Sequence, residues 1–373
     1  MTDSAPVDLH CHSTASDGTA RPAEVVRLAS DAGLSALALT DHDTVAGVAE
    51  AAGESARLGL DFLPGIELSC SFPRPGTLHL LGYGVDPASP ALLKLIDEQT
   101  RAREVRNRLI VERLNGLGLD VSWDEVLEEA GAGRGENDET RNGGTRDDAA
   151  RDDAARDDAA RDDAARGGAA RGGGATIGRP HLAAVLVRKG LVASARQAFD
   201  RYLGGAGGAY VDTNRLSADR AIAAVRAAGG VASLAHPLLL RRQTPQQLEA
   251  MVRELAEQGL EAIETIHSGH DADTVARLTR LADRLDLLTT GGSDFHGSAK
   301  PGIRIGKPAG REVPRGFYDR LLHCLRRRRA THRGRPADAP TPAVVADRPG
   351  RAGPPSAGQP LQPWQQGSVM NRS

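Results

Sequence analysis

The feature that most constrains the fold is an alternation of short apolar runs with helix-like segments in the first part of the chain. Four apolar runs have the length of buried strands, at residues 7–11, 34–39, 62–68 and 78–83. Between them, residues 22–32 and 45–58 have the apolar spacing of helices. This alternation is typical of parallel strands covered by crossover helices, so it predicts a βα barrel or an open α/β sheet.

The alternation is interrupted after Pro90 by a long helical pattern and resumes at Gly230. The stretch Ser-Trp-Asp-Glu from Ser122 to Glu125 is a capping box, which predicts that a further helix starts there. Three later stretches predict further strands, because in each an apolar run is followed by polar residues: GVASLAH, LEAIETIH and LDLLTTGGSDFH. We therefore predict one domain over residues 5–330, with a helical insertion at residues 90–205.

Two segments are predicted to be disordered. Residues 131–175 are built around the pentapeptide RDDAA, which begins at Arg146 and later degrades into RGGAA. Because each helical residue turns by about 100°, the alanine pair rotates by about 140° per repeat and no apolar stripe forms. Pairs such as Asp152 with Arg156 leave a transient, solvated helix as the alternative. The tail, residues 331–373, is rich in Pro, Arg and Gly.

Composition argues against several classes of function. The formal net charge is −2, so the chain as a whole does not favour a nucleic-acid or membrane surface. Aromatic residues make up 3% of the chain, which argues against an extended platform for stacked bases and favours small substrates or short RNA. The arginine run at residues 326–329 is predicted to be a solvated helix end, with RNA contact as the alternative.

The cysteines and the hydropathy of the chain indicate its compartment. Three cysteines without paired spacing predict no disulfide framework. The sequence has no run of about 18 apolar residues that could span a bilayer. We therefore expect a cytoplasmic protein that does not associate with membranes, and we expect no stable protein partner.

Polar residues follow the predicted strands. His10 and His12 are two residues apart on a strand, so their side chains project to one face, a geometry for holding one metal ion. A lone His-x-His pair is more often incidental, but further ligand-type residues occupy the other strands or their ends: Asp41, His42, Glu67, His79, His236, Asp294 and His296. In a βα barrel such groups converge on one rim. Core or surface histidines without a metal are the alternative.

These motifs resemble those of the PHP (polymerase and histidinol phosphatase) phosphoesterases. The matching segments, in order, are Asp8-Leu-His-Cys-His12 with Asp17, Thr40-Asp-His-Asp43, Gly65-Ile-Glu67, His79, Ala235-His-Pro237 and Ser293-Asp-Phe-His296. The resemblance implies an α/β fold, a distorted (β/α)7 barrel with a trinuclear metal site. It implies that the first ion is held by His10, His12, Glu67 and Asp294, the second by Glu67, His79 and His236, and the third by Asp17, His42 and His296.

The ligand chemistry narrows the choice of metal. Imidazole and carboxylate together suit Mn²⁺, Fe²⁺ or Zn²⁺, and the absence of a cysteine ligand argues against a structural zinc site. We expect Mn²⁺, with Fe²⁺, Zn²⁺ or Mg²⁺ as alternatives. The resemblance further implies that a metal-bound hydroxide, held by way of Glu67, Asp294 and His236, attacks the phosphate ester.

The segment Gly178-Arg-Pro-His181 indicates a branch of this family. A guanidinium beside a helix amino terminus suits a phosphate oxygen, so Arg179 and His181 are candidates for binding substrate phosphate. An ordinary helix start with a surface pair is the alternative. Similar segments occur in the branch of 3′,5′-nucleoside bisphosphate phosphatases, whose relatives trim short RNA from the 5′ end. His267 is a further candidate, either for binding a second phosphate or for orienting a ligand.

The predicted activity is hydrolysis of phosphate esters in small nucleotides, such as 3′-phosphoadenosine 5′-phosphate, or at the 5′ ends of short oligoribonucleotides. Histidinol phosphatase is one alternative, and a non-catalytic PHP scaffold module is another. Asp8 and Asp43 are candidates for orienting histidine rings. For Asp43, capping of the following helix is the alternative.

Overall fold

A seven-stranded sheet organises the structure, a computed structural model that describes residues 5–71, 77–132, 177–205, 207–211, 216–240 and 244–333. The strands lie in the sheet in the order of the sequence. They are β1 (Val7–Asp8), β2 (Ala36–Leu39), β3 (Asp61–Ser71), β4 (Thr77–Tyr83), β5 (Val231–Leu234), β6 (Ala262–Ile266) and β7 (Leu288–Gly291). Each run predicted from the sequence is therefore a strand, although the first keeps ladder pairing for only two residues.

The sheet closes on itself. The Leu9 amide donates to the Gly291 carbonyl at 3.1 Å, just beyond the ends of β1 and β7. Further along, the Asp294 amide donates to the His10 carbonyl at 2.8 Å, and the His12 amide donates to the Phe295 carbonyl at 2.9 Å. These bonds join the first and last strands of the sheet. The α/β barrel predicted from the sequence is confirmed.

The orientation of β4 differs from the sequence prediction. We expected parallel strands throughout this part of the chain, but β4 pairs antiparallel with both β3 and β5. The chain from Ser71 to Thr77 is far shorter than the dozen or so residues that a parallel crossover requires. His79 lies near the beginning of β4. Because β4 runs antiparallel to its neighbours, this position is at the rim where β2 and β5 end.

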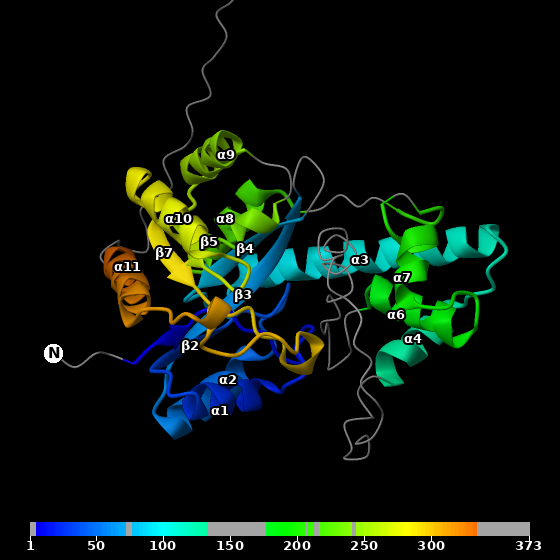
Figure 1. Ribbon diagram of the computed structural model, residues 1–373, viewed down its shortest axis with the longest axis horizontal. Coiled ribbons are helices and arrows are strands. Elements are labelled where there is room, and N and C mark those ends of the chain that lie inside the picture. Colours follow the sequence, from blue (N-terminus) through cyan, green and yellow to red (C-terminus); the bar gives the residue numbers. More distant parts are fainter. Residues whose placement is uncertain are drawn as a thin grey trace, which may run out of the picture. The chain divides into compact units, whose positions relative to one another are not determined.

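Helices surround the barrel (Figure 1). They are α1 (Pro22–Asp31), α2 (Val48–Leu58), α8 (Ala218–Ala227), α9 (Pro245–Glu257), α10 (Ala272–Arg284) and α11 (Arg315–Arg333). Their apolar faces pack on the outside of the strands, as where Val225 of α8 and Leu278 of α10 join Leu80 and Ile263 in one buried cluster. The predicted helices at residues 22–32 and 45–58 correspond to α1 and α2. The arginine run at residues 326–329 lies within α11.

The helix α3 (Pro90–Gly116) connects the barrel to the insertion. Near its start, Leu92 and Leu95 join the barrel core. Its later residues Ile110 and Leu114 join a separate core with the helices α4 (Trp123–Ala132), α6 (Arg179–Arg188) and α7 (Ala195–Ala198), and with the short π-helix Phe199–Leu203 (Figure 1). One helix therefore belongs to two hydrophobic cores.

The helix α4 begins where the sequence predicts. The Ser122 amide donates to Glu125 Oε2 at 2.8 Å, and the Glu125 amide donates to Ser122 Oγ at 3.1 Å, so the capping box is confirmed. The RDDAA tract and the tail lie outside the described residues, apart from the ends of α4 and α11. The barrel and the helical insertion belong to one compact unit, Met1–His332. Over the described ranges, no helix combines the length and the hydropathy needed to cross a bilayer.

Candidate metal centre

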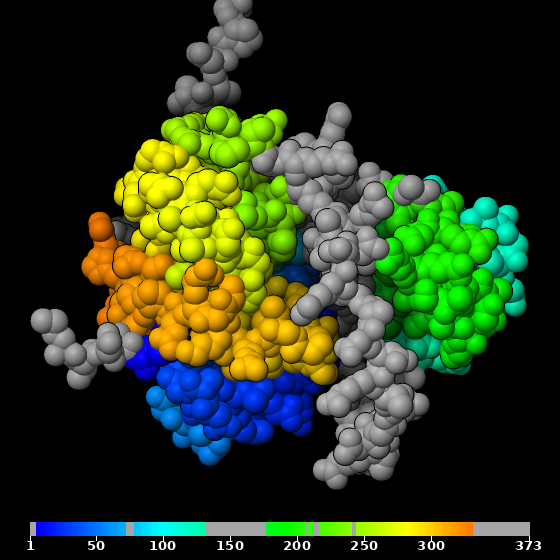
Figure 2. All heavy atoms as spheres, viewed as in Figure 1, coloured from blue at the N-terminus to red at the C-terminus, as the bar shows by residue number. Residues whose placement is uncertain are grey.

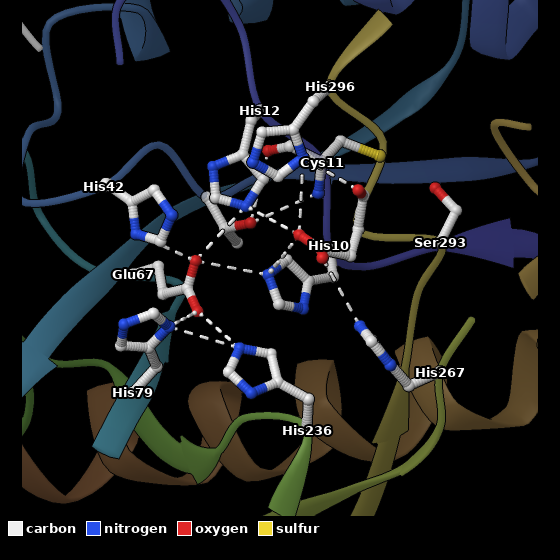
Figure 3. Close-up of polar contacts among 12 residues, drawn as sticks. His10, Cys11, His12, His42, Glu67, His79, His236, His267, Ser293 and His296 are labelled. Carbon is white, nitrogen blue, oxygen red and sulfur yellow. Dashed lines mark hydrogen bonds and ion pairs between the residues drawn. The ribbon is translucent and has the colours of Figure 1, made fainter. Parts of the chain in front are cut away.

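Histidines and carboxylates from separate strands meet at one rim of the barrel (Figure 3). Their side chains are all buried or nearly so, and they come from the segment after β1 (His10, His12, Asp17), the end of β2 (His42), the strands β3 (Glu67) and β4 (His79), the end of β5 (His236) and the segment after β7 (Asp294, His296). The structure thus brings together every residue that the resemblance nominates as a metal ligand. Their role as ligands stays a prediction.

Glu67 lies at the centre of this group, with imidazoles beside both of its oxygens (Figure 3). Its Oε2 lies 3.1–3.3 Å from ring nitrogens of His10, His12 and His42. Its Oε1 lies 2.8 Å from His79 Nδ1 and 3.1 Å from His236 Nε2. Because each oxygen faces a different set of imidazoles, this one carboxylate has the arrangement needed to join two metal sites.

Two aspartates extend the group on either side of His12. Asp294 Oδ1 lies 3.3 Å from His12 Nε2 and 3.5 Å from His10 Nε2. Asp17 Oδ2 lies 3.1 Å from His296 Nε2 and 3.7 Å from His42 Nε2. The carboxylates and imidazoles therefore alternate across the rim.

The donor set fits divalent metal ions. Ligand atoms lie within 4.8 Å of one another in three groups, namely His12, Asp17, His42 and His296, then His10, His12 and Glu67, then His42, Glu67 and His79. Several buried atoms in these groups form no hydrogen bond within the described chain: both ring nitrogens of His12, His42 Nδ1, His296 Nε2 and Asp17 Oδ2. Buried polar atoms are normally satisfied, so a cation shared by these lone pairs accounts for them. These groups differ from the implied ligand sets in three ways: Asp294 and His236 belong to none of them, His42 stands in place of His236 beside Glu67 and His79, and His12 joins Asp17, His42 and His296.

Burial and charge act in opposite directions on these side chains. Burial lowers the pKa of His12, but Asp294, Glu67 and Asp17 more than offset this and raise the pKa to about 9. Burial alone would raise the pKa of Glu67, yet the surrounding imidazoles hold it well below its usual range. The pKa of His42 falls well below its usual range, chiefly because of burial. The carboxylates are thus ionised and the imidazoles are in electrostatic contact with them.

Three non-glycine residues beside the centre have left-handed backbone conformations. The φ angles are 52° at Asp43, 24° at His236 and 58° at Asp294. Such conformations are costly and cluster at functional sites, where the surrounding structure imposes them. Two of these residues, His236 and Asp294, are candidate ligands. The backbone therefore has a costly conformation at positions whose side chains lie in the metal centre.

Glu264 contacts two candidate ligands, and the sequence analysis did not single it out. Its Oε1 accepts a hydrogen bond from His10 Nδ1 at 2.9 Å, and its Oε2 accepts from the His236 amide at 2.7 Å. The side chain is fully buried in β6, and although burial raises its pKa, the neighbouring histidines lower it to about 2. A carboxylate in this position fixes the ring of one candidate ligand and the backbone of another. The signal in the sequence was an acidic residue between apolar ones in AIETI.

Asp8 contacts backbone amides, and Asp43 contacts a backbone amide and the Arg103 side chain; neither contacts a histidine ring of the described chain. Asp8 accepts hydrogen bonds from the amides of His10, Ser293 and Gly306 at 2.6–3.2 Å. Asp43 Oδ1 accepts from the Ser69 amide at 2.8 Å, and its Oδ2 contacts Arg103 of α3. Neither the ring-orienting role of these residues nor the helix-capping role of Asp43 is seen.

A cavity of about 510 Å³ opens beside the metal centre. His267 and Lys300 line it together with Glu67, His236 and Asp294. His267 Nε2 lies 3.5 Å from Asp294 Oδ2, and Lys300 Nζ donates to the same oxygen at 2.7 Å. The structure thus places one predicted substrate residue, His267, in this cavity. It adds Lys300, which the sequence analysis did not single out.

Arg179 and His181 lie within the insertion. The buried Arg179 donates from Nη1 to the Leu203 carbonyl at 2.8 Å and lies beside the rings of Phe199 and Tyr210. His181 Nδ1 accepts from the Gly178 amide at 3.1 Å, which closes the first turn of α6. The cavity beside the metal centre is lined by neither residue. Their contact with substrate phosphate stays a prediction.

Fold and site together define a class of enzyme. An α/β barrel with imidazoles and carboxylates gathered at one rim, beside a cavity, is the arrangement of a metal-dependent hydrolase.

Comparison with known proteins specifies the class further. The PHP domain family matches residues 8–113. The chain belongs to this family of metal-dependent phosphoesterases, since two relatives match over most of their length. One is a 5′-3′ exoribonuclease of Haemophilus influenzae, with 31% identity over 78% of this chain and 89% of the relative. The other is a 3′,5′-nucleoside bisphosphate phosphatase of Chromobacterium violaceum, with 31% identity over 81% of this chain and 91% of the relative.

A solved structure agrees with this assignment. A Bifidobacterium adolescentis protein described as a metal-dependent phosphoesterase superposes with a TM-score of 0.63 and 31% identity. The superposition covers 85% of this chain and 96% of that protein.

Proposed function

We propose that this phosphoesterase acts on small nucleotides, with a 3′,5′-nucleoside bisphosphate or the 5′ end of a short oligoribonucleotide as substrate. The observation that carries the proposal is the position of Glu67, whose two oxygens face separate sets of imidazoles beside a cavity. The exoribonuclease and the bisphosphate phosphatase described above suggest the substrate class. A cavity of about 510 Å³ is in the range of sites that hold small molecules.

We assign three divalent ions to the centre, with Mn²⁺ as the expected metal. His10, His12, Glu67 and Asp294 would hold the first, Glu67, His79 and His236 the second, and Asp17, His42 and His296 the third. Ions held there would polarise phosphoryl oxygens and lower the pKa of bound water. The unsatisfied buried atoms His296 Nε2 and Asp17 Oδ2 support the third site, and the unsatisfied His12 Nε2 supports the first.

Residues of the chain itself would position the substrate. Burial lowers the pKa of Lys300, but Asp294 more than offsets this and raises it, so Lys300 is charged at neutral pH. An ammonium group in the cavity attracts a phosphate dianion and limits its orientation. His267 lines the same cavity, where a ring nitrogen is available to a phosphoryl oxygen. Glu264 would keep His10 in one tautomer.

The cysteines support a cytoplasmic location. Cys11, Cys70 and Cys324 are thiols rather than disulfides. Free thiols persist in reducing compartments, where disulfides are rare. Cell fractionation with an antibody against the chain would test this location.

A metal analysis combined with a phosphate-release assay tests the proposed function. The purified protein, loaded with Mn²⁺, would be offered a 3′,5′-nucleoside bisphosphate, a 5′-phosphorylated short RNA and histidinol phosphate. We expect bound metal and the highest kcat/KM on one of the two nucleotide substrates. A preference for histidinol phosphate would overturn the nucleotide assignment. Full metal content without turnover of any ester would indicate a non-catalytic scaffold.

A further inference from the structure

A second cavity adjoins the metal centre. It has a volume of about 540 Å³ and is lined by Ser268, Gly302, Ile303, Arg304, Lys307, Ala309 and Gly310. Ser268, Gly302 and Ile303 also line the cavity that contains Glu67 and Asp294. The two cavities therefore share a wall, and a ligand longer than one phosphate ester can extend from the first into the second.

The charge of the second cavity differs from that of the first. No carboxylate is among its described lining residues, whereas both Arg304 and Lys307 are. The Lys307 ammonium contacts Glu312, so its charge is already balanced. The exposed Arg304 side chain makes neither a hydrogen bond nor an ion pair with any described residue. Arg304 is therefore a guanidinium with its donors available to a ligand.

Neighbouring arginines are engaged in holding the fold. Arg311 Nη1 donates to the His270 carbonyl at 2.9 Å, and Arg315 donates from Nη1 to the Ser35 carbonyl at 3.1 Å. The second cavity also leaves room beside its backbone, because an added Cβ at Gly302 or Gly310 would meet no atom within 4 Å. An anion can thus approach Arg304 without displacing side chains.

The loop that carries Arg304 is anchored to the segment that bears the candidate ligands. The Gly306 amide donates to Asp8 Oδ2 at 2.6 Å, while Asp8 Oδ1 accepts from the amides of His10 and Ser293. Figure 2 shows the loop at the surface, in orange, between the blue atoms of α1 and α2 and the yellow atoms of α10. The buried Asp8 carboxylate therefore fixes the spacing between Arg304 and the metal centre. A ligand that binds at two points needs such a fixed spacing between the groups that hold it.

We propose that Arg304 binds a second phosphate group of the substrate while the first lies at the metal centre. The proposal rests on the proposed nucleotide hydrolysis and specifies the group that the second cavity recognises. A planar guanidinium makes paired, charge-assisted hydrogen bonds to phosphate oxygens. Two sources of this phosphate fit the same chemistry: the second phosphate of a nucleoside bisphosphate, and the next phosphodiester of a short RNA.

The test compares wild type, Arg304→Ala and Arg304→Lys on three substrates: 3′-phosphoadenosine 5′-phosphate, a 5′-phosphorylated diadenylate and p-nitrophenyl phosphate. The last has no second phosphate. We expect Arg304→Ala to lower kcat/KM on the order of 10- to 100-fold on one or both nucleotide substrates, and less than about threefold on p-nitrophenyl phosphate. Arg304→Lys should recover part of the loss, because it keeps the charge but not the paired geometry.

Arg280→Ala is the matched control, because Arg280 is exposed on α10 and lines neither cavity. A loss on the bisphosphate alone identifies the second phosphate of a nucleoside bisphosphate, and a loss on the diadenylate alone identifies the phosphodiester. An equal loss on all three substrates, or no loss on either nucleotide, overturns the proposal.

A binding measurement separates this proposal from the proposed function. If the wild type hydrolyses none of the nucleotides, the proposed function fails, and calorimetric titration of wild type and Arg304→Ala with 3′-phosphoadenosine 5′-phosphate still decides the role of Arg304. Binding at least tenfold weaker in the variant supports the second phosphate site. Equal binding in the two proteins overturns it.

Discussion

Glu67 is the residue on which the proposed metal sites depend most. Each of its oxygens contacts at least two imidazoles, so Glu67→Gln replaces one oxygen of a shared ligand by an amide that cannot coordinate in the same way. We expect the variant to lose bound metal and nearly all turnover while the apolar strand β3 still forms. Elemental analysis and kcat for the purified variant would check this. Full metal stoichiometry with the wild-type rate would show that the carboxylate is not shared.

The electrostatics of His12 predict how metal affinity varies with pH. Its raised pKa of about 9 means that the metal-free protein holds a proton there at neutral pH, and metal must displace it. Apparent metal affinity should therefore rise between about pH 6 and 9, by up to about tenfold per pH unit for each proton released.

Stability of the metal-free protein should respond to pH in the opposite direction. The contribution of protonated His12 is fully present below its unfolded pKa of about 6.5 and is lost as the pH rises through about 9. Metal titrations at several pH values, together with thermal unfolding in a chelator, would measure both effects. A metal affinity that does not vary with pH would contradict the prediction.

Glu264 is predicted to be a positioning residue. In Glu264→Gln the amide can accept from only one of its two partners, His10 Nδ1 and the His236 amide. Loss of such a partner typically costs about 10- to 100-fold in metal affinity or activity. We expect weaker metal binding, with kcat largely restored at saturating metal. A low kcat that excess metal does not restore would indicate a direct part in the chemistry.

Sequence analysis located the site residues that stand at the ends of predicted strands. His10, His12 and Asp294 stand at strand ends, where a pattern of apolar runs followed by polar residues is visible without a structure. Glu264 was missed because one acidic residue inside a strand has the same pattern as a solvent-facing one. Arg304 was missed because its position depends on how a loop meets Asp8, nearly three hundred residues earlier.

At the scale of elements, the helix α3 has residues buried in two hydrophobic cores. The second core is the one that holds the helices of the insertion together. Leu114 is fully buried there against residues of the insertion. Leu114→Ala should lower the free energy of unfolding by about 2–5 kcal/mol, since it removes apolar contact and leaves a cavity. Leu117→Ala is the control, because Leu117 is 51% exposed and should cost less than about 0.5 kcal/mol. Urea unfolding of both variants would check the difference.

Sequence analysis predicted the strands of the sheet but misjudged the direction in which two of them pair. The apolar runs at residues 62–68 and 78–83 gave β3 and β4 correctly, yet not their antiparallel pairing. Periodicity reports which residues are buried and says nothing of strand direction, which here follows from the short connection between Ser71 and Thr77. Arg179 is a second example. The sequence predicted that a helix starts there, but it did not predict that the guanidinium contacts the Leu203 carbonyl.

At the scale of the whole molecule, the RDDAA tract is predicted to be dispensable. If the tract were helical, its alanine positions would rotate from repeat to repeat and would offer no face for packing, and loop-closure entropy varies only slowly with length. Deleting residues 146–166 should change Tm by less than about 3 °C and leave kcat/KM within about twofold, as expected for a loss under about 0.5 kcal/mol. Thermal unfolding and steady-state kinetics would measure both. A large fall in either quantity would show that the tract contributes to stability or activity.

The closure of the barrel has a consequence for biosynthesis. The backbone bonds that join His10 to Asp294 and His12 to Phe295 link the first residues of the domain to some of its last. A ribosome emits the amino-terminal histidines first, at about 5–20 residues per second, and the Asp294 carboxylate follows only after most of the domain has emerged. A nascent chain therefore presents imidazoles that have no partner yet. We expect the complete set of ions to be acquired only after translation has passed His296.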